Sequence, residues 1–404
     1  MSDNVVIIGA SHAAAEAVTS LRKQGWEGGI TLIGDEPLLP YQRPPLSKGY
    51  FKGDTSAEKL LIKGAKVYEN ARVNLKLGTR VSKIDKQRKQ IQLATDEKLD
   101  YSHLILATGT RARTLPIDGA DFPQVCYLRN LADVDKIKSF TSEAAHMLVV
   151  GAGYIGLEVA ASAVRKGIKV TVLEAMDRVL ARVTSPVVSD FYQSLHAEND
   201  VKIRLNSVLK EFQKEGDNLY AIMNDGERIK FDCAVVGIGV LPNIELAEAA
   251  GLACDNGILV NEYGQTSDPN IYAVGDCSNH PSVLYGRHIR LESVPNAVEQ
   301  AKVAASSICG KKVAYNQVPW FWSDQYQVKL QTVGLFTGYD QSVIRGSVAD
   351  SKFSVFYLKD TQLIAMDAIN SPADFMLSKK LVSEQACPKP EQLEDLNISL
   401  KSLL

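Results

Sequence analysis

Two stretches of the chain repeat the same order of apolar and polar positions. Val5–Ile8 and Met147–Val150 are continuous apolar runs, which are typical of parallel strands buried on both faces. Each run leads into a loop of small residues and then into apolar positions at helical spacing. A second apolar run follows each helix, Ile30–Ile33 in one stretch and Val170–Leu173 in the other. The pattern therefore predicts two units of strand, tight turn, helix and strand.

The loop of the second unit has the spacing G-x-G-x-x-G and contains Gly151, Gly153, Tyr154, Ile155 and Gly156. Glycines at this spacing let the backbone N–H groups approach a pyrophosphate at the positive end of the following helix. Glu174 ends the second strand, where a carboxylate accepts hydrogen bonds from an adenosine ribose. Because strand, helix and acid are in register, we expect a dinucleotide site. The alternative is a glycine-tightened turn without a ligand.

The first unit has the same layout with fewer glycines. Its loop contains Gly9, Ser11, His12, Ala13 and Ala14, and Asp35 follows its second strand. Ala14 is tolerated because that position needs only close packing of helix on strand. The Ser11 side chain crowds a pyrophosphate, so this loop alone is the weaker prediction. Two such units on one chain indicate two dinucleotides, a flavin and a nicotinamide.

The chain is long enough, at 404 residues, for two or three domains. Strands running into Ala107-Thr108-Gly109 and Gly237-Ile238-Gly239 suggest where it leaves and re-enters the first domain. We expect an α/β fold with two Rossmann-like domains, one inserted in the other, and a C-terminal α+β domain. The predicted boundaries are 1–110 and 240–317 for the FAD-binding domain, 111–239 for the NAD-binding domain and 318–404 for the C-terminal domain.

A second part of the flavin site follows a later strand. Gly275-Asp276 comes at the carboxyl end of Ile271–Val274, where ligands of open α/β sheets gather and an aspartate can hold a ribityl hydroxyl. An ordinary Gly-Asp turn is the alternative. Pro295 suits a helix beginning, and the positive end of that helix would favour a reduced, anionic flavin.

Composition and cysteine spacing exclude several classes. The chain has 45% hydrophobic and 23% charged residues and a net charge of −2, so no overall basic field points to nucleic acid. No basic cluster precedes the first apolar run, so we expect a cytoplasmic protein without a membrane role. The six cysteines contain no C-x-x-C pair, so neither a metal site nor the dithiol of a disulfide reductase is predicted.

Four segments carry a resemblance that spans nearly the whole chain: GDEPLLPYQRPPLSKGY (34–50), GYIGLEVAASA (153–163), ESVPNAVEQA (292–301) and PWFWSDQY (319–326). They resemble the oxygenase-coupled, putidaredoxin-reductase-like NADH–ferredoxin reductases, within the glutathione-reductase-like two-dinucleotide flavoproteins. The resemblance implies an enzyme that passes electrons from NADH through FAD to a [2Fe–2S] ferredoxin. That ferredoxin would feed a cytochrome P450 or a dioxygenase.

The resemblance also implies roles for single residues. It assigns FAD contacts to Ala13, Asp35, Lys48, Val81, Arg129, Asp276 and Val294, and NADH contacts to Gly151, Gly153, Gly156 and Glu174. Lys48 and Glu158 would form a pair beside the flavin and are the candidate catalytic residues, with Trp320 and Trp322 near the ring. Arg43 and Gly239, from the same parts of the chain, complete the expected cofactor-binding set. Each assignment has a structural alternative. Lys48 would be a solvated loop lysine, and Glu158 an acid that is favourable in the first turn of a helix. The tryptophans would belong to the core, and Arg129 to the surface.

Other functions share these cofactors. A monodehydroascorbate or rubredoxin reductase, or a redox-sensing protein like apoptosis-inducing factor, would also bind FAD and NADH. An NADH oxidase or peroxidase would carry a redox cysteine early in the chain, whereas the first cysteine here is Cys126. For ferredoxin docking we expect a local basic patch, with Arg287 and Arg290 as first candidates and Arg72 and Lys329 as weaker ones.

Overall fold

The computed structural model describes residues 3–142 and 145–404, and they divide into two compact units. The first unit comprises the chain up to Gln42, Leu60–Arg111 and Leu241–Pro319, and the second comprises Arg43–Lys59, Ala112–Val240 and Trp320–Leu404. Segment 43–59 thus packs with the second unit, although it lies between two segments of the first. The boundaries of three functional domains stay a prediction.

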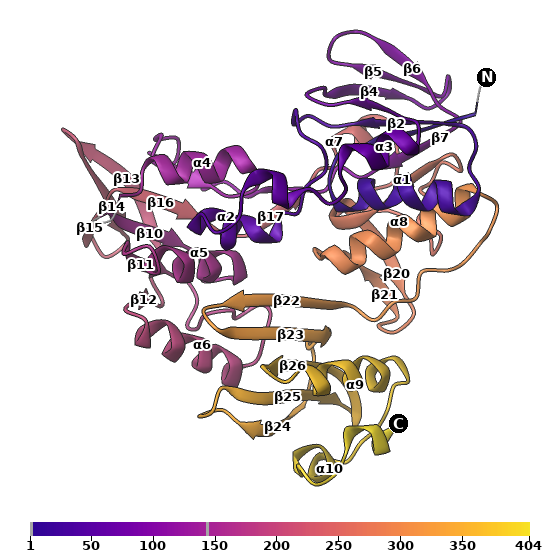
Figure 1. The fold of residues 1–404 in the computed structure, drawn as a ribbon. Coiled ribbons are helices and arrows are strands. Elements are labelled where there is room, and N and C mark those ends of the chain that lie inside the picture. Colours follow the sequence, from indigo (N-terminus) through magenta and orange to yellow (C-terminus); the bar gives the residue numbers. More distant parts are fainter. Residues whose placement is uncertain (1–2, 143–144) are drawn as a thin grey trace. The chain divides into compact units, whose positions relative to one another are not determined.

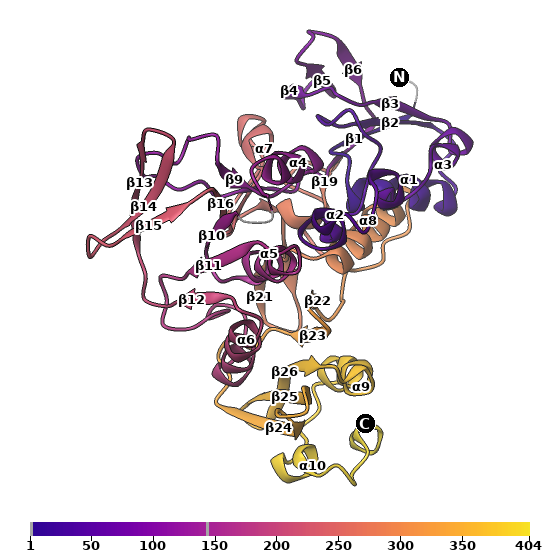
Figure 2. The same cartoon turned by 60° about the vertical axis from the view of Figure 1, so that its left-hand side comes forward.

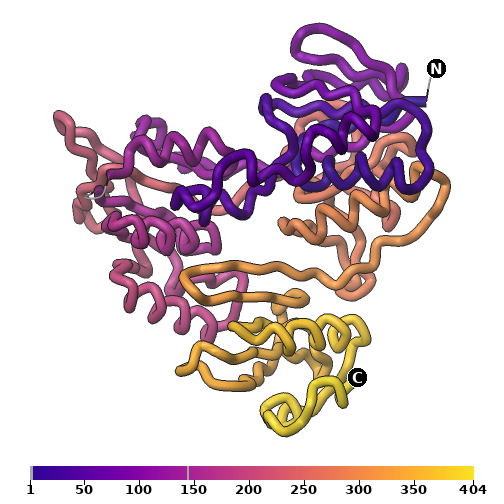
Figure 3. Tube along the Cα trace, in the orientation of Figure 1, coloured from indigo at the N-terminus to yellow at the C-terminus, as the bar shows by residue number. Residues whose placement is uncertain are grey.

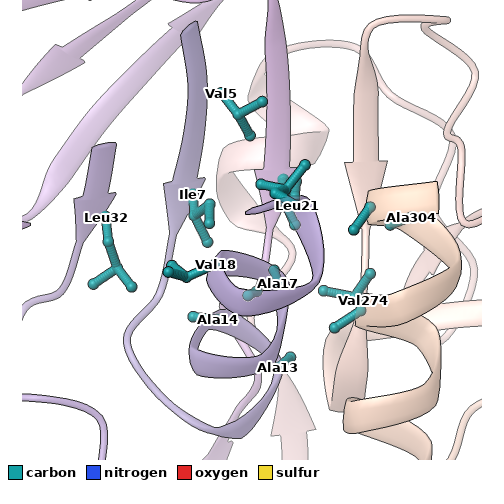
Figure 4. Packing of buried hydrophobic residues seen from close by; sticks show 14 of the residues in the cluster. Val5, Ile7, Ala13, Ala14, Ala17, Val18, Leu21, Leu32, Val274 and Ala304 are labelled. Atoms are coloured by element: carbon teal, nitrogen blue, oxygen red, sulfur yellow. The ribbon is translucent and has the colours of Figure 1, made fainter. Parts of the chain in front are cut away.

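The first unit is built on a parallel sheet with the strand order β19-β7-β1-β2-β3. Its strands are β1 (Asn4–Ile8), β2 (Gly29–Ile33), β3 (Val73–Lys76), β7 (His103–Leu106) and β19 (Ile271–Ala273). Helices α1 (His12–Gln24) and α8 (Val294–Ile308) lie side by side on one face of this sheet (Figure 1). Between them and the strands, Val5, Ile7, Val18 and Leu21 are fully buried (Figure 4).

The other face of this sheet is also covered, which explains why β1 is apolar from Val5 to Ile8. Val6 and Ile8 pack in a second cluster with Val81 and Ile91, which belong to an antiparallel sheet in the order β4-β5-β6. That sheet, which the sequence patterns did not predict, consists of β4 (Val81–Asp85), β5 (Gln90–Leu93) and β6 (Lys98–Asp100). The remaining elements of this unit are α3 (Ala65–Asn70), α7 (Glu245–Ala249), β18 (Ile258–Leu259), β20 (Ser278–Ser282), β21 (Arg287–Ile289) and the 3-10 turn Gly275–Cys277. The 3-10 turn Ala57–Leu60 lies where the chain passes from the second unit to the first, at Lys59.

The second unit contains another parallel sheet, in the order β12-β11-β10-β16-β9. Its strands are β9 (Val125–Tyr127), β10 (His146–Val150), β11 (Lys169–Leu173), β12 (Lys202–Arg204) and β16 (Cys233–Val236). Helix α5 (Tyr154–Val164) packs on β10 and β11 (Figure 2). The neighbouring elements are the 3-10 turn Pro44–Ser47, α2 (Gly49–Lys52), α4 (Leu131–Ser139), α6 (Pro186–Glu198), and an antiparallel sheet of β13 (Leu209–Glu215), β14 (Asn218–Met223) and β15 (Arg228–Phe231). The short strands β8 (Thr110–Ala112) and β17 (Val240–Pro242) lie where the chain passes between the units.

The C-terminal part of the second unit is an antiparallel sheet, β22-β23-β26-β25-β24, with helix α9 packed on it. Figure 3 follows the chain through these hairpins to the C-terminus. The elements are β22 (Trp320–Gln325), β23 (Val328–Gly334), β24 (Gln341–Ser347), β25 (Lys352–Lys359), β26 (Gln362–Ile369), α9 (Pro372–Ser383), α10 (Pro390–Glu394) and the 3-10 turn Leu400–Leu403. The expected α+β character of this region is confirmed. The hydrophobic pattern does not indicate strand β22, because its mixed polar and aromatic sequence has no clear period of two.

The predicted fold class is confirmed: two parallel α/β sheets and a C-terminal α+β module. Within residues 3–142 and 145–404, no helix combines the length and apolar character that crossing a membrane requires. The same ranges contain no cluster of histidine, cysteine and acidic side chains arranged to hold a metal ion.

Candidate functional site

The glycine loop of the second unit has the geometry that a dinucleotide loop needs. Gly151 has φ +101°, and a Cβ there would lie 2.6 Å from the carbonyl oxygen of Gly237. A Cβ on Gly156 would lie 2.1 Å from the carbonyl oxygen of Gly151, so helix α5 approaches the strand end too closely for any side chain. Gly153 differs, because a Cβ there would meet nothing within 4 Å. It is the N-cap of α5, and no side chain caps the helix.

The two outer glycines therefore close the turn, and Gly153 leaves open space in front of the uncapped helix N-terminus. This is the shape into which a pyrophosphate fits. Tyr154 and Ile155 form the first turn of α5: Ile155 is exposed, and the Tyr154 ring lies 4.5 Å from the ring of Phe321. Gly239, at φ +105°, also has no neighbour within 4 Å of a built Cβ.

The acid of this unit is tied to the loop. Oε2 of Glu174 accepts a hydrogen bond from the backbone N–H of Ala152 at 2.7 Å, and Oε1 accepts one from Met176 at 2.9 Å. The carboxylate is thus held at the end of β11. Arg178, the nearest arginine in sequence, donates to the carbonyl oxygens of Thr184 at 2.9 Å and Ala181 at 2.8 Å. Its guanidinium is therefore engaged away from Glu174.

The loop of the first unit makes the same turn with different side chains. Gly9 has φ +113°, and a Cβ there would lie 2.1 Å from the carbonyl oxygen of Ala107. Ser11 is the N-cap of α1 but does not cap it by its side chain; its hydroxyl lies 3.4 Å from Nδ1 of the adjacent His12. Ala13 and Ala14 are buried in the core beneath. The helix N-terminus is consequently uncapped here too, and the Ser11 hydroxyl is turned along the helix toward His12.

The acid of the first unit stands one residue further along the chain. In the sheet register Ile8 pairs with Ile33, as Val150 pairs with Leu173, so Gly34 occupies the place of Glu174. Asp35 follows with an exposed side chain. The structure therefore puts Asp35 close to, but not at, the position that the repeated pattern indicates.

The Gly275-Asp276 turn is fixed by a buried amide. Gly275 has φ +78°, and its N–H donates to Oε1 of Gln300 on α8 at 2.7 Å. Ser278 Oγ donates to the same oxygen at 2.7 Å. The carboxylate of Asp276 accepts from Thr110 Oγ1 at 3.3 Å, and its backbone oxygen accepts from Arg290 at 3.2 Å. Gln300 therefore anchors this turn to the helix that begins at Val294, and sequence analysis missed it.

The turn at Thr108-Gly109 is cross-linked by another residue that was missed. Thr108 Oγ1 donates to the backbone oxygen of Asn243 at 2.7 Å, and Asn243 Nδ2 donates to the backbone oxygen of Thr108 at 2.8 Å. The N–H of Asn243 donates to the carbonyl of Gly109 at 2.9 Å. Val81 is buried in the antiparallel sheet of the same unit.

Lys48 and Glu158 are far apart in sequence and form an ion pair in the second unit. Lys48 Nζ lies 2.6 Å from Glu158 Oε2. Glu158 is buried on α5, and two hydroxyls also donate to it: Ser47 to Oε2 and Ser323 to Oε1, each at 2.6 Å. A buried carboxylate requires such partners, because an unpaired charge removed from water is costly. The predicted pair is thus present with two donors that sequence analysis did not identify, although Ser323 lies within the PWFWSDQY segment.

The remaining predicted residues of the second unit lie in two groups. Arg43 Nη1 donates to the backbone oxygen of Arg129 at 2.8 Å, and the N–H of Arg129 donates to Asp133 at 2.9 Å. Trp320 and Trp322 lie on β22 with ring centroids 5.7 Å apart. Both tryptophans are partly exposed, so neither is fully buried core. Their roles toward a cofactor stay predictions.

Two cysteines that are distant in sequence meet in space. Cys126 on β9 and Cys233 on the adjacent strand β16 are both buried, and their thiols interact with each other. Because the two cysteines are widely spaced in sequence, their contact was not predicted. The hydrogen bond with Cys126 and burial raise the pKa of the Cys233 thiol, so it stays protonated and unreactive.

Comparison with known proteins gives the same family as the resemblance seen in the sequence. Residues 3–301 match the family described as pyridine nucleotide-disulphide oxidoreductase, and residues 320–404 match the reductase C-terminal family. The chain is 44% identical to rhodocoxin reductase of Rhodococcus erythropolis over 98% of its own length and 93% of that protein. It is also 44% identical to putidaredoxin reductase CamA of Pseudomonas putida, over 100% of its own length and 97% of that protein.

Among solved structures, the covalent complex of putidaredoxin reductase with putidaredoxin contains a similar chain. It matches with a TM-score of 0.95 and 44% identity, covering 99% of this chain and 98% of that one. The similarity therefore extends through both units and the C-terminal module. The chain belongs to the pyridine nucleotide-disulphide oxidoreductase family, within its putidaredoxin-reductase-like ferredoxin reductases.

Proposed function

We propose that this protein is an NADH-dependent ferredoxin reductase, which passes electrons through FAD to a [2Fe–2S] ferredoxin. The ferredoxin in turn would supply a cytochrome P450 or another oxygenase. The observation that carries the proposal is the presence, in one chain of this family, of two glycine loops with uncapped helix N-termini, each on its own parallel sheet. The names of the relatives, rhodocoxin and putidaredoxin reductase, support the choice of acceptor.

In this proposal the second unit holds the nicotinamide dinucleotide. The backbone around Gly151, Gly153 and Gly156 would receive the pyrophosphate, because Gly153 leaves the space in front of α5 open. Glu174 would accept the hydroxyls of the adenosine ribose. A carboxylate disfavours a phosphate at the same position, which supports NADH as the donor.

The first unit would hold FAD. Gly9 and the N-terminus of α1 would face the pyrophosphate, Asp276 the ribityl chain, and the beginning of α8 at Val294 the flavin ring. FAD supplies the chemistry that the side chains lack, since it accepts a hydride from NADH and releases electrons singly to an iron–sulfur cluster. The protein's own task is to place the two rings face to face, which requires positioning rather than a general base.

Lys48 and Glu158 would hold a positive charge at a fixed place in the second unit, and the family resemblance indicates that this charge serves the flavin. The ion pair and two serine hydroxyls fix the carboxylate, and the carboxylate fixes the ammonium group of Lys48. A fixed cation stabilises negative charge that develops nearby without reorganising at the moment of reaction.

Steady-state assays with several acceptors test the proposal. The purified protein should be yellow, with about one FAD per chain, and should reduce ferricyanide with NADH. It should reduce cytochrome c rapidly only when putidaredoxin, used as the probe, is added. Faster turnover with rubredoxin or monodehydroascorbate would favour those reductases, and a stable NADH complex with little turnover would favour a redox sensor. Because NADH is supplied in the cytoplasm, we also propose a cytoplasmic location, which cell fractionation checks.

A further inference from the structure

A line of buried hydrogen bonds runs from the Lys48–Glu158 pair across the second unit. Ser323 Oγ donates to Glu158 Oε1 at 2.6 Å, and Gln325 Nε2 donates to Ser323 Oγ at 3.3 Å. Gln325 Oε1 lies 2.8 Å from Nε2 of His196, and Nδ1 of His196 lies 3.1 Å from the hydroxyl of Tyr326. The line joins α5, β22 and α6, and it ends at a partly exposed tyrosine.

The interior of this line is closed to solvent. Ser323 and His196 are 0% exposed and Gln325 is 1% exposed, so each polar atom depends on the partner that the fold provides. Burial lowers the pKa of His196 to about 4. The ring is consequently neutral near pH 7, with one nitrogen donating and the other accepting.

The proton positions along the line follow from the charge on Glu158. An ionised carboxylate paired with Lys48 only accepts, so the single proton of Ser323 must point at Glu158. The lone pairs of Ser323 then accept from the NH₂ group of Gln325, which turns Oε1 of Gln325 toward His196. That oxygen also only accepts, so His196 must carry its proton on Nε2, and Nδ1 must accept from Tyr326.

The opposite orientation would leave an unfavourable contact. If the Gln325 amide were reversed, its oxygen would face Ser323, and the Ser323 hydroxyl would donate its hydrogen bond to Gln325 instead of Glu158. Two oxygens, Ser323 Oγ and Glu158 Oε1, would then face each other at 2.6 Å without a hydrogen between them. Tyr154 and Tyr192 interact electrostatically with Glu158, and both hydroxyls stay neutral because burial raises their pKa values.

We propose that Ser323, Gln325 and His196 are positioning residues for the Lys48–Glu158 pair, acting through one fixed direction of hydrogen bonding. The proposal rests on the proposed function only in that the pair serves the flavin. The tautomer of His196 on α6 is thereby coupled to the orientation of the buried Glu158 carboxylate on α5. A purely structural role would need the same residues to be buried but would not require a single tautomer.

Nuclear magnetic resonance of histidine ring nitrogens tests the coupling without any assay of activity. The chain has six histidines, so the spectrum of ¹⁵N-histidine-labelled holoprotein is small, and His196→Phe assigns the signal. We expect one tautomer with the proton on Nε2. In Ser323→Ala the Gln325 amide loses its acceptor, and the ratio of the Nε2–H to the Nδ1–H tautomer should fall about tenfold, the equivalent of one hydrogen bond. Ser323→Thr, which keeps a hydroxyl, should restore the wild-type signal.

Ser378→Ala is the matched control, because Ser378 is a fully buried serine of the same unit whose hydroxyl has no hydrogen-bond partner among the described residues. It should leave the His196 signal unchanged. A proton on Nδ1 in the wild type, or the wild-type tautomer ratio in Ser323→Ala, would overturn the inference. If Ser323→Ala does not fold, Gln325→Met, which is similar in volume, must change the tautomer ratio instead.

Stopped-flow reduction by NADH provides the second measurement. Ser323→Ala should slow flavin reduction about tenfold while FAD content and the Kd for NADH stay at wild-type values, because only the placement of Glu158 and Lys48 is loosened. An unchanged rate would contradict the positioning role. A wild-type protein that binds no flavin would instead contradict the proposed function and would leave the tautomer result valid.

Discussion

The carboxylate of Glu174 accepts a hydrogen bond from the backbone N–H of Ala152 at 2.7 Å. This contact links the acid at the end of β11 to the loop between Gly151 and Gly153, so the residue that would bind the ribose also holds the pyrophosphate loop in shape. The nearby cation, Arg178, is bound to the backbone oxygens of Ala181 and Thr184. The charge available to a ribose at this place is therefore negative.

Glu174→Ala should weaken NADH binding and narrow the difference between NADH and NADPH. Loss of a charge-assisted hydrogen bond costs about 1.5–3 kcal/mol, which corresponds to an increase of about 10- to 100-fold in KM for NADH. The wild type should have a lower kcat/KM for NADPH than for NADH. Equal kcat/KM values for the two cofactors in the wild type would refute the assignment of Glu174.

Asp276→Ala should lower FAD occupancy, and Gln300→Leu should do the same from a distance. Asp276 would contact the ribityl chain, whereas Gln300 acts on the turn through the N–H of Gly275. We expect both variants to lose FAD on gel filtration, measured as the ratio of absorbance at the flavin and protein bands. Added FAD should restore Gln300→Leu more fully, since its own contact with the cofactor is indirect. Full FAD occupancy in Asp276→Ala would show that the Gly275-Asp276 turn is not part of the flavin site.

The parallel sheets and glycine loops were predictable because the information is local. Continuous apolar strands, a turn needing positive φ at Gly9 and Gly151, and helical periodicity lie within short windows. The Lys48–Glu158 contact came only from resemblance. Nothing in the spacing indicates that segment 43–59 packs with the second unit, because this is decided by long-range burial.

The polar residues that were missed share one property: each acts on a neighbour rather than on a ligand. At the positions of Ser323, Gln300 and Asn243, the sequence pattern indicates only a small or polar residue and does not reveal its partner. Their partners are fixed by strand register and helix packing, as Asn243 is by Thr108 and Gly109. Cys126 and Cys233 show the same limit, since only the pairing of β9 with β16 brings them together.

Asp367 should make the protein less stable as the pH rises from about 4 to about 6. This carboxyl is buried on β26 and accepts hydrogen bonds from Thr184 and Tyr357, yet burial raises its pKa to about 6. The folded state then holds a proton that the unfolded state, with a pKa of about 3.9, has released, so stability falls over this window and is constant above it.

The shift corresponds to about 3 kcal/mol as an order of magnitude. Asp367→Asn removes the titration. Its unfolding free energy, measured in urea relative to wild type, should therefore improve between pH 4 and pH 7. A difference that stays constant across this range would show that Asp367 does not titrate in the folded protein.

Arg345→Lys should loosen the C-terminal segment. The buried Arg345 donates to the carbonyl oxygens of Leu393 at 3.0 Å, Asp395 at 2.7 Å and Ile398 at 3.0 Å. Lysine lacks the planar fork, so at least one buried carbonyl loses its donor, at a cost of about 1–3 kcal/mol. Urea unfolding and limited proteolysis after residue 390 measure the effect. The exposed Arg182→Lys is the control and should change stability by less than about 0.5 kcal/mol. Equal changes in stability and proteolysis in the two variants would show that the Arg345 hydrogen bonds do not hold the C-terminal segment.

The structure distinguishes between Arg287 and Arg290, the two first candidates for ferredoxin docking. Arg290 is 11% exposed, pairs with Glu292 at 2.7 Å and donates to the backbone of Asp276, so its charge is engaged inside the first unit. Arg287, on β21, is exposed. Arg287 is therefore the better candidate for contact with an acidic ferredoxin.

Arg287→Glu should reduce putidaredoxin-linked cytochrome c reduction several-fold and leave NADH–ferricyanide reduction unchanged, because charge reversal acts mainly on the rate of encounter. The linked rate of the wild type should fall as salt increases from about 50 to 300 mM, and that of the variant should fall less, since screening removes an attraction that the variant already lacks. Arg290→Glu should lower both activities, because it disturbs the turn that holds Asp276. If Arg287→Glu also lowered both activities, Arg287 would belong to cofactor binding, and the docking surface would have to include other basic residues.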